Sequence, residues 1–518
     1  LMDRLPPGAL MQRAAAGLAA VSAGLLTRVS GARVVVLAGS GDNGGDALYA
    51  AARLAGRGAV VLAIQAGSKI HDEGAAALRA AGGRLASPED PAVPAAIGAA
   101  DLILDGLLGI GGRGGLREPQ ASLAGLAARS PAVVVAVDLP SGVDADTGVV
   151  EGAAIQADVT VTFGTMKPGL LVDPGAGHAG VIELVDIGLG PFLGPPDLLA
   201  LQAADTGGLL ARPPAESDKY RRGVAGIVAG SQRFTGAAAL AVGGALRGGA
   251  GMVRLVSAEH AVAVVRVLWP EAVITVTGGH PPAEDIPAAG RVQAWVAGPG
   301  MGTDDDARQR LAAVLASDVP VLVDADGLTI LAADRSLLDR AAPTLLTPHA
   351  GELGRLLGAD PADVEARRLE HARRAAAEVG ATVLLKGSTT VIASPDPAMP
   401  AYVNPTGTSW LATAGTGDVL SGLAGALLAQ GLRPAEAAAA AAYLHGLAAR
   451  QAAAGSGERP APAIEPTPAT PAGAAGTAGT AGLDAAAGGD GPAEAPIAAA
   501  DVIGALPGAI RWVRQQAG

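Results

Sequence analysis

The sequence predicts an α/β protein made of two doubly wound, three-layer domains. Short runs rich in Val, Leu and Ile alternate with Ala-rich helical segments, which is typical of parallel sheets covered by helices on both faces. The alternation stops at a Gly/Pro-rich segment, residues 190–196, and then starts again. The chain has 518 residues, whereas a typical domain has roughly 100–200.

The strands expected in the first domain are continuous apolar runs, residues 33–37, 59–64, 101–104, 132–137, 159–163 and 181–185. Such runs indicate strands that are buried on both faces of a sheet. Because Gly and Pro interrupt regular structure, we expect a boundary within residues 190–215 and a first domain that spans residues 1–205.

The strands expected in the second domain are residues 224–229, 252–256, 272–277, 294–297, 320–323, 344–346, 382–385 and 389–393. We expect this domain to span residues 212–518. Within it, residues 453–496 consist mostly of Ala, Gly, Pro and Thr, a composition that cannot bury a core and predicts a disordered insert. Residues 498–516 are expected to return as a packed helix.

Composition excludes several classes of protein. The net charge of −12 disfavours nucleic-acid partners, which require a basic surface. The sequence has no run of the roughly 18 apolar residues that a membrane span needs. Cys is absent, which excludes disulfides and thiolate metal sites. The first residues lack the basic-then-apolar pattern of a secretion signal, so we expect a cytoplasmic enzyme.

Lysine is rare among the basic residues. Of 37 Lys and Arg residues, only Lys69, Lys167, Lys219 and Lys386 are lysines. Because a compact ammonium and a planar guanidinium are not equivalent, a retained lysine indicates a position where Arg will not serve. Chance survival is the alternative, with most force for Lys69, which lies outside the motifs described below.

Three polar loops in the first domain each follow an expected strand, at residues 38–47, 105–113 and 137–148. Doubly wound folds build their ligand sites at the carboxyl ends of strands, and Gly lets the backbone approach a phosphate. One Gly-rich loop is equally compatible with an ordinary tight turn. Three such loops, two of them placing an Asp at a strand end, favour a functional site.

These loops resemble the YjeF N-terminal family, the NAD(P)H-hydrate epimerases, over roughly residues 8–190. The motifs that carry the resemblance are residues 42–47, 105–111 and 138–148, and the segment from Lys167 to Leu170 adds to it. Departures from the family pattern are Asp42, Ala47, Gly106 and Ile110.

The resemblance implies a Rossmann-like domain with Asp138 as the catalytic residue beside the reacting ring. It implies substrate contacts from two loops, made by Asp42, Asn43, Gly44, Gly45, Asp46, Gly109, Ile110, Gly111, Gly112 and Arg113. It also implies a potassium ion at Asn43, Asp105 and Ser141, whose amide, carboxylate and hydroxyl are suitable hard oxygen ligands.

In the second domain, Gly415–Gly417 open a long Ala-rich segment, with Asp418 in its first turn. The amides of a helix start can stabilise charge on a transferring phosphoryl group, and Asp418 is placed to accept a proton. A simple helix cap is the alternative. Further polar loops after strands, at residues 297–302, 323–327, 347–352 and 386–390, favour an active site.

Together these loops resemble the ADP/ATP-dependent NAD(P)H-hydrate dehydratases of the ribokinase-like superfamily, over residues 212–518 without the insert. Departures are Thr408 and Trp410. The resemblance implies a ribokinase-like domain in which Ala237, Gly302, His349 and the catalytic Asp418 contact the substrate. It implies that ADP, with Mg²⁺, is bound by Lys386, Gly387, Ser388, Thr389, Thr390 and Gly417.

The implied function is metabolite repair of NADH or NADPH hydrated at C6 of the nicotinamide ring. The first domain would interconvert the R and S epimers, and the second would dehydrate the S form with ADP, giving AMP and phosphate. ADP rather than ATP rests on the resemblance. We expect a homo-oligomer with no nucleic-acid or membrane partner. A sugar or vitamin kinase with an accessory domain is one alternative, and a noncatalytic binding protein is another.

Overall fold

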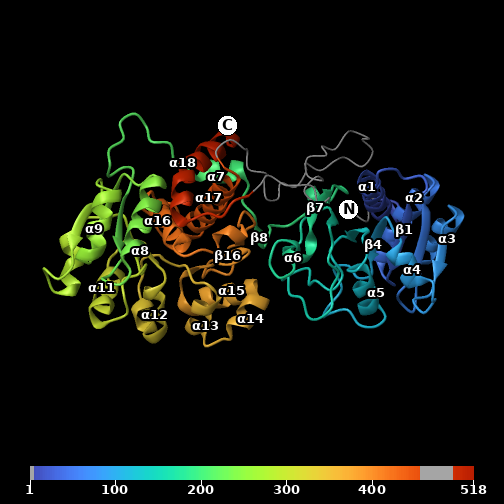
Figure 1. Ribbon diagram of the computed structural model, residues 1–518, viewed down its shortest axis with the longest axis horizontal. Coiled ribbons are helices and arrows are strands. Elements are labelled where there is room, and N and C mark those ends of the chain that lie inside the picture. Colours follow the sequence, from blue (N-terminus) through green and yellow to red (C-terminus); the bar gives the residue numbers. More distant parts are fainter. Residues whose placement is uncertain (1–4, 456–493) are drawn as a thin grey trace. The chain divides into compact units, whose positions relative to one another are not determined.

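The computed structural model describes residues 5–455 and 494–518. These residues form two compact α/β units, one ending at Pro195 and the other beginning at Pro196 (Figure 1). Both units contain parallel sheets covered by helices, which confirms the predicted fold class. Within the described ranges, no helix is long and apolar enough to cross a membrane.

The sheet of the first unit is parallel throughout, in the order β3-β2-β1-β4-β5-β6-β7. Its strands are β1 (Arg33–Ala38), β2 (Val60–Gln65), β3 (Arg84–Ala86), β4 (Leu102–Gly106), β5 (Val133–Val137), β6 (Val159–Phe163) and β7 (Val181–Val185). The chain leaves β1 toward β2 and β3 and then crosses to β4 on the other side of β1. This reversal of strand order is where doubly wound folds bind ligands.

Two apolar cores cover the two faces of this sheet. Val34 and Val36 of β1 lie in one core with the first three helices, and Val35 and Leu37 lie in the other with α4 and α5, because successive strand residues point to opposite faces. The helices are α1 (Ala9–Leu25), α2 (Asp42–Gly56), α3 (Asp72–Ala80), α4 (Val93–Gly98), α5 (Gln120–Ala127), α6 (Ala176–Ala179) and the 3-10 turns η2 (Pro168–Leu170) and η3 (Gly190–Phe192).

The second unit has a ten-stranded sheet in the order β11-β10-β9-β12-β13-β14-β15-β16-β17-β8. Only the pairs β15–β16 and β16–β17 are antiparallel among the described strands. The strands are β8 (Leu198–Leu199), β9 (Val224–Val228), β10 (Met252–Ser257), β11 (Val273–Val276), β12 (Ala294–Ala297), β13 (Val321–Val323), β14 (Thr344–Leu346), β15 (Thr382–Leu385), β16 (Thr390–Ala393) and β17 (Ala401–Asn404).

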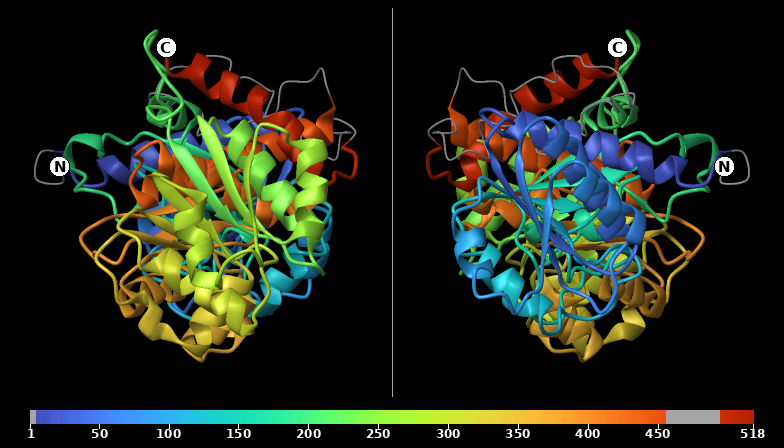
Figure 2. Two further views of the ribbon diagram at one scale, coloured as in Figure 1. Left: turned by 90° about the vertical axis from the view of Figure 1, so that its left-hand side faces the viewer. Right: turned by 90° about the vertical axis from the view of Figure 1, so that its right-hand side faces the viewer.

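Helices cover both faces of this sheet as well (Figures 1 and 2). On one face, six helices share the largest apolar core: α7 (Ala203–Leu209), α8 (Thr235–Arg247), α9 (Glu259–Leu268), α16 (Thr416–Ala429), α17 (Pro434–Ala454) and α18 (Ala499–Gln516). The remaining helices of the described residues are α10 (Asp285–Ala289), α11 (Asp305–Leu315), α12 (Asp326–Ala333), α13 (Ala350–Leu357), α14 (Pro361–Ala366), α15 (Arg368–Val379) and the 3-10 turns η4 (Pro282–Glu284), η5 (Arg335–Leu338) and η6 (Ser409–Leu411). Figure 1 shows α11–α14 on the opposite side of the sheet from α16–α18.

Some elements differ from the sequence-based expectation. Strands β3, β8 and β17 were not expected from the sequence. Each is short, and β8 pairs with β17, which lies far from it along the chain. As a result β8 and α7 belong to the second unit, although the predicted first domain extends to residue 205. Ala453 lies within α17 and its carbonyl accepts a hydrogen bond from Ala495 N, so the edges of the expected insert, residues 453–496, are ordered; residues 456–493 lie outside the described ranges.

Candidate active sites

The three polar loops of the first unit converge at the carboxyl ends of β1, β4 and β5. The β1–α2 turn lies so close to the loop after β4 that a Cβ on Gly39 would stand 1.9 Å from Leu107 O. A Cβ on Gly44 would stand 2.3 Å from Gly39 O. These approaches require glycine, and they bring the predicted substrate and cation residues together.

Two of the three predicted potassium ligands, Asn43 and Ser141, hydrogen-bond the backbone of Leu108, and the third, Asp105, is bonded to Ser141. Asn43 Nδ2 donates to Leu108 O at 2.8 Å, and Ser141 Oγ accepts from Leu108 N at 2.9 Å. Ser141 also donates to Asp105, through Oγ at 2.7 Å and through N at 2.8 Å. The structure therefore places a carboxylate, an amide, a hydroxyl and a carbonyl in one cluster of hard oxygen donors.

Asp105 is completely buried in that cluster. Burial raises the pKa of Asp105 to about 6, against the opposing effect of the hydrogen bonds from Ser141 and Leu107. No Lys, Arg or His pairs with Asp105 within the described residues. A buried carboxylate without a charged partner is a position that a single monovalent cation would compensate.

Asp138 follows β5 with a left-handed backbone, φ 68°. Its Oδ1 accepts hydrogen bonds from Lys167 Nζ, from Phe163 N at 3.2 Å and from Thr162 Oγ1 at 3.2 Å. The Lys167 ammonium also donates to Thr162 Oγ1 at 2.9 Å and to Phe163 O at 3.1 Å. The carboxylate and ammonium are mostly buried, at 14% and 13% exposure, so Lys167 is a fixed electrostatic partner of Asp138.

Asp46 lies on α2 and lines a cavity of about 360 Å³ together with Asp42 and Phe163. Its Oδ1 is buried and has no hydrogen-bond partner within the described residues. Burial raises the pKa of Asp46 to about 8, assisted by the negative charges of Asp138 and Asp42. At neutral pH, the carboxyl of Asp46 is therefore protonated and able to donate.

The other predicted substrate residues of the first unit divide into two groups. Gly45 is buried, and a Cβ there would lie 2.9 Å from the His71 ring. The segment from Gly109 to Arg113 is more open, and the Ile110 side chain is 58% exposed. Arg113 forms ion pairs with Asp144 and with Asp146, the latter at 2.9 Å, which holds this loop against the loop after β5.

In the second unit, Lys386 and Asp324 form the centre of a buried charged cluster. Lys386 Nζ lies 2.7 Å from Asp324 Oδ1, and Ser421 Oγ donates to Asp324 Oδ2 at 2.7 Å. Glu352 is 3.9 Å from the same ammonium. Burial alone would lower the pKa of Lys386, but the charges of Asp324 and Glu352 outweigh burial and leave that pKa raised.

Asp418 and Gly417 lie at the start of α16, beside this cluster. A Cβ on Gly417 would stand 3.6 Å from Lys386 Nζ and 4.0 Å from Asp324 Oδ2. Burial raises the pKa of Asp418 to about 7; the negative charge of Asp324 adds to this effect and Lys386 opposes it. The structure thus brings the Asp418 carboxylate, the Lys386 ammonium and the start of α16 at Gly417 close together.

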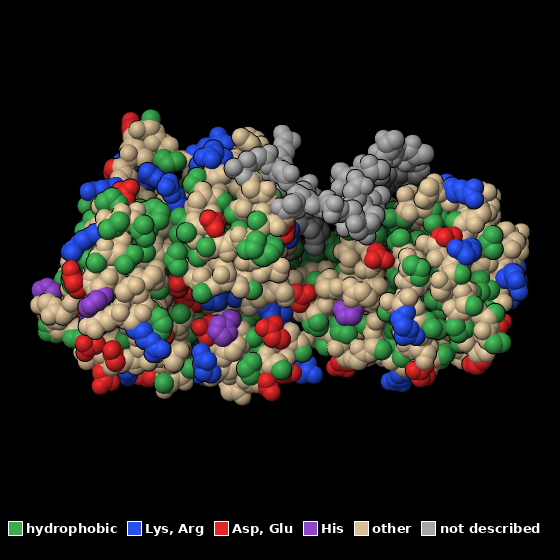
Figure 3. All heavy atoms as spheres, in the orientation of Figure 1, with side chains coloured by type: hydrophobic (Ala, Val, Ile, Leu, Met, Phe, Trp, Pro, Cys, Tyr) green, Lys and Arg blue, Asp and Glu red, His purple; other side chains and the backbone are tan. Residues whose placement is uncertain are grey.

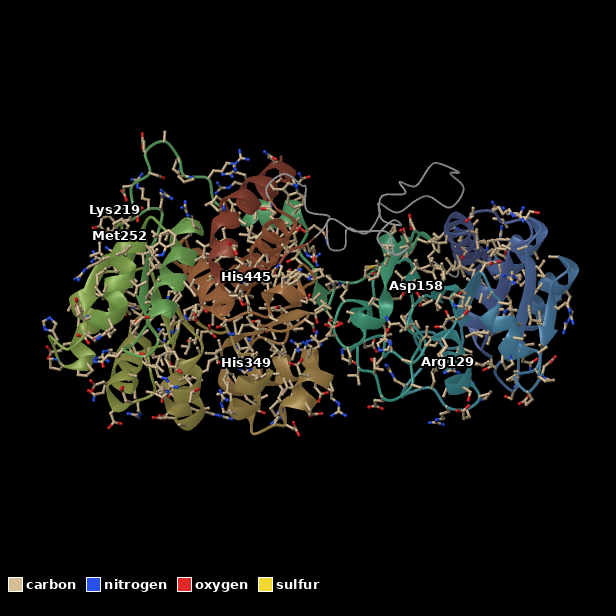
Figure 4. The ribbon with its side chains drawn as sticks, in the orientation of Figure 1. Arg129, Asp158, Lys219, Met252, His349 and His445 are labelled. Atoms are coloured by element: carbon tan, nitrogen blue, oxygen red, sulfur yellow. The ribbon has the colours of Figure 1, made fainter. Side chains whose placement is uncertain are left out.

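Of the three remaining predicted substrate residues, Ala237 lies in the first turn of α8, whereas Gly302 and His349 lie on loops that follow β12 and β14. A Cβ on Gly300 would lie 2.9 Å from Ala237 Cβ, and Gly302 N donates to Asp326 Oδ2 at 2.9 Å. His349 caps α13, with Nδ1 accepting from Gly351 N at 3.0 Å, and its side chain is 58% exposed. Figure 4 marks His349 on the second unit.

Arg368 hydrogen-bonds the backbone of the turn from Lys386 to Thr390, which is predicted to bind the nucleotide. This arginine is fully buried and donates to Lys386 O at 2.8 Å and to Thr389 O at 3.1 Å. Gly387 and Ser388 are exposed, whereas Thr389 is buried and Thr390 begins β16. The exposed part of the turn is therefore its tip.

Four important residues had no assigned role at the sequence level: Lys167, Asp324, Arg368 and His445. For Lys167 the scarcity of lysine was a usable signal, and Asp324 follows a strand as the other site acids do. His445 is buried in α17 (Figure 4); burial lowers its pKa to about 4, against the opposing effect of the Thr416 backbone at the start of α16. Nothing in the sequence near Arg368 or His445 marks these contacts, because their partners are distant along the chain.

Comparison with known proteins identifies both halves. The family model described as YjeF-related protein N-terminus matches residues 7–169, and that described as NAD(P)H-hydrate dehydratase matches residues 225–466. A crystal structure of the ADP/ATP-dependent NAD(P)H-hydrate dehydratase from Bacillus subtilis, co-crystallized with ATP/Mg²⁺, is 34% identical, with a TM-score of 0.44, covering 48% of this chain and 87% of that chain.

Two curated relatives match along most of the chain. The bifunctional NAD(P)H-hydrate repair enzyme Nnr of Mycobacterium tuberculosis (strain ATCC 25618 / H37Rv) is 48% identical over 446 residues, which are 85% of this chain and 88% of the relative. That of Mycobacterium leprae is 47% identical over 476 residues, which are 90% of this chain and 94% of the relative. The chain therefore belongs to the family of bifunctional NAD(P)H-hydrate repair enzymes.

Proposed function

We propose that this chain repairs hydrated NADH and NADPH in two steps. The unit that ends at Pro195 forms the domain that interconverts the R and S hydrates. The unit that begins at Pro196 forms the domain that dehydrates the S hydrate with ADP, giving NAD(P)H, AMP and phosphate. The observation that carries the proposal is the presence in one chain of two acid–base centres, one at Asp138 and one at Asp418.

Epimerisation is assigned to proton transfers at the C6 hydroxyl and the ring nitrogen. C6 of the hydrate bears both groups, so it is a carbinolamine. Removal of the hydroxyl proton allows the C6–N1 bond to break, with the electron pair going to N1 and an aldehyde forming at C6. Rotation about C5–C6 and attack of N1 on the other face then give the opposite epimer, with no net change in oxidation state.

Asp138 accepts the hydroxyl proton and Asp46 protonates N1 as the C6–N1 bond breaks. Lys167 holds the Asp138 carboxylate through the ion pair described above, and Asp46 carries an available proton because burial raises its pKa to about 8. Two carboxyl groups with opposite protonation states are the usual arrangement for paired acid and base catalysis.

The potassium site is proposed at Asn43, Asp105 and Ser141. Asp105 supplies a single negative charge and the other donors are neutral, which suits a monovalent cation better than a divalent one. When bound, the ion would supply the positive charge that keeps Asp105 ionised. The three side chains would then fix the Leu108 loop that borders the substrate.

Dehydration is assigned to phosphorylation followed by elimination. Asp418 accepts the proton of the C6 hydroxyl of the S hydrate. The hydroxyl oxygen attacks the terminal phosphoryl group of ADP, and AMP leaves. The amides at the start of α16 hold the negative charge of the transferred group. Loss of the C5 proton then forms the C5–C6 double bond as the C6–O bond breaks and phosphate, a better leaving group than hydroxide, departs.

Mg²⁺ is proposed to bind as a complex with the nucleotide. Mg²⁺ in phosphoryl-transfer sites is held mainly by phosphate oxygens and one or two carboxylates. Asp326 is the candidate here, since its charge acts on Asp418 at the start of α16. Outside the undescribed segments, no three His, Asp or Glu side chains form a dedicated metal cage.

The test is to incubate the chain with R or S hydrated NADPH and to follow the return of absorbance at 340 nm, with ADP or ATP. Wild type should restore absorbance from both epimers, Asp138→Asn mainly from S, and Asp418→Asn from neither. A sugar or vitamin kinase would give no absorbance with either epimer. We also propose a homo-oligomer, which light scattering would reveal as a mass that is a multiple of one chain.

A further inference from the structure

The second unit contains a cavity lined by arginines that the repair chemistry does not use. The cavity measures about 530 Å³ and is lined by Arg212, Arg221, Arg222, Arg247, Arg511 and Arg514, with no acidic residue in its described wall. A second cavity of about 460 Å³ shares Arg221 with it and is lined also by Arg254, Arg291 and one acidic residue, Asp218. This concentration of arginine contrasts with a net charge of −12 for the whole chain.

Most of these guanidinium groups have no carboxylate partner. Within the described residues, Arg221 is the only one of the six that forms an ion pair, with Asp218 at 4.0 Å. Arg222 and Arg514 donate instead to the carbonyls of Gly249 and Ala211. Arg514 Nε is buried without any partner in the described ranges. Arginine stays charged in proteins, so the cavity holds an unbalanced positive charge.

Helix termini account for only part of this charge. Arg247 and Arg514 lie in the last turns of α8 and α18, where a positive side chain compensates about half an elementary charge per helix. Six guanidiniums exceed that requirement. The charge of Arg212 also adds to burial in lowering the pKa of Arg514 from its ordinary value, so the structure holds like charges close together.

The cavity is remote from the dehydratase centre. Gln430, at the end of α16, lines the cavity, whereas Gly417 and Asp418 lie at the start of the same helix. Because α16 has 14 residues, the two ends are about 20 Å apart at 1.5 Å per residue. Figure 4 shows Lys219, which precedes Arg221 and Arg222 in the sequence, well separated from His349. Figure 3 shows Lys and Arg side chains on the surface of the second unit around the position of Lys219.

The shape of the cavity indicates the class of ligand. Its volume is that of a small-molecule site, and Leu210, Leu246 and Ile510 give one wall an apolar surface. Guanidinium groups recognise phosphate through paired charge-assisted hydrogen bonds. We propose that this arginine cavity is a second anion site, which binds the phosphate chain of a small polyphosphorylated ligand such as a nucleoside diphosphate.

Calorimetric titration of the full chain with ADP tests the site. Wild type should bind one ADP at the dehydratase centre and one at the arginine cavity. Two of the exposed arginines of the cavity are replaced in R222Q/R511Q. This variant should bind only the first ADP or bind the second about tenfold or more weakly, because two charge-assisted hydrogen bonds disappear. Thermal unfolding and dehydratase turnover should match wild type, which shows that the variant is folded.

The matched control is R266Q/R308Q, which removes two exposed arginines outside the cavity. It should retain both ADP sites, and R222K/R511K should retain part of the second. Inorganic tripolyphosphate is the parallel probe. If R222Q/R511Q loses affinity for tripolyphosphate alone, the cavity is assigned to inorganic polyphosphate. If it loses affinity for both tripolyphosphate and the second ADP, the cavity is assigned to a nucleotide. Equal binding of both probes by R222Q/R511Q and wild type, or an equal loss in the control, would overturn the proposal.

Discussion

Lys386 Nζ lies 2.7 Å from Asp324 Oδ1 and 3.6 Å from the position that a Cβ on Gly417 would occupy. The lysine charge is thus balanced by an acid from a different strand before any nucleotide is bound. Because Asp324 raises the pKa of Asp418 and Lys386 lowers it, the pair adjusts the proton acceptor as well as the phosphate site.

Asp418→Asn should abolish most dehydration and leave nucleotide binding intact. Removing a general base costs roughly 10²–10⁴-fold in rate, whereas Asn and Asp are equivalent as simple helix caps. The recovery of absorbance at 340 nm measures the rate, and calorimetry measures ADP affinity. The variant should unfold at no lower temperature at pH 8, because burial already penalises the ionised carboxylate. A rate within a few-fold of wild type would exclude Asp418 as the base.

Dehydration should rise with pH through about 7. Asp418 acts in its ionised form, and burial followed by the charge of Asp324 raises its pKa to about 7. Asp324→Asn removes the charge that raises the pKa and leaves Lys386 free to lower it, so the acidic limb of the kcat/KM profile should move to lower pH. A profile that keeps its position in this variant would contradict the assigned coupling.

Gly417→Ala should weaken nucleotide binding without affecting the fold. The added Cβ would stand 3.6 Å from Lys386 Nζ, an ordinary contact in the empty protein, but it would occupy space beside the transferred phosphate. Crowding of about 1–3 kcal/mol corresponds to a loss of roughly 5- to 150-fold in ADP affinity. The control is Gly504→Ala on α18, where a Cβ meets nothing within 4 Å; it should leave affinity unchanged.

Lys167→Arg should slow epimerisation by about tenfold or more, because hydrogen bonds to charged groups are worth about 1.5–3 kcal/mol. The Lys167 ammonium has three partners in a mostly buried position, which a longer planar group cannot reproduce. Consumption of the R hydrate with excess dehydratase measures the rate. Lys69→Arg, at an exposed position, is the matched control. An equal loss of epimerisation rate in both variants would contradict the role assigned to Lys167.

Epimerisation should fall as pH rises through about 8. Asp46 is proposed to act as an acid, and burial raises its pKa to about 8, so the protonated form is lost above that value. Asp46→Asn should remove this limb of the profile and lower the rate at pH 7. If the basic limb persists in the variant, another group is responsible for it.

The sequence was informative wherever a residue acts at the end of its own strand. Asp105, Asp138 and Ser141 were singled out in this way, since parallel strands place their carboxyl ends at one edge, whereas Asp418 was singled out by the Gly-rich start of its helix. Contacts made across the sequence were not predictable. The pairing of Asp138 with Lys167 depends on how the loop after β6 folds back, and Arg368 reaches the turn at residues 386–390 from α15. No local pattern encodes such contacts.

The pairing of β8 with β17 decides where the second unit can be cut from the chain. Leu198 and Leu199 hydrogen-bond along β17, and α7 packs on α18. A fragment that begins at residue 212, where the dehydratase motifs begin, would lose both elements. It would leave an open sheet edge, which templates association with other chains, and would uncover apolar side chains of α18. A fragment that begins at Pro196 keeps its own edge strand and is the one suited to expression in isolation.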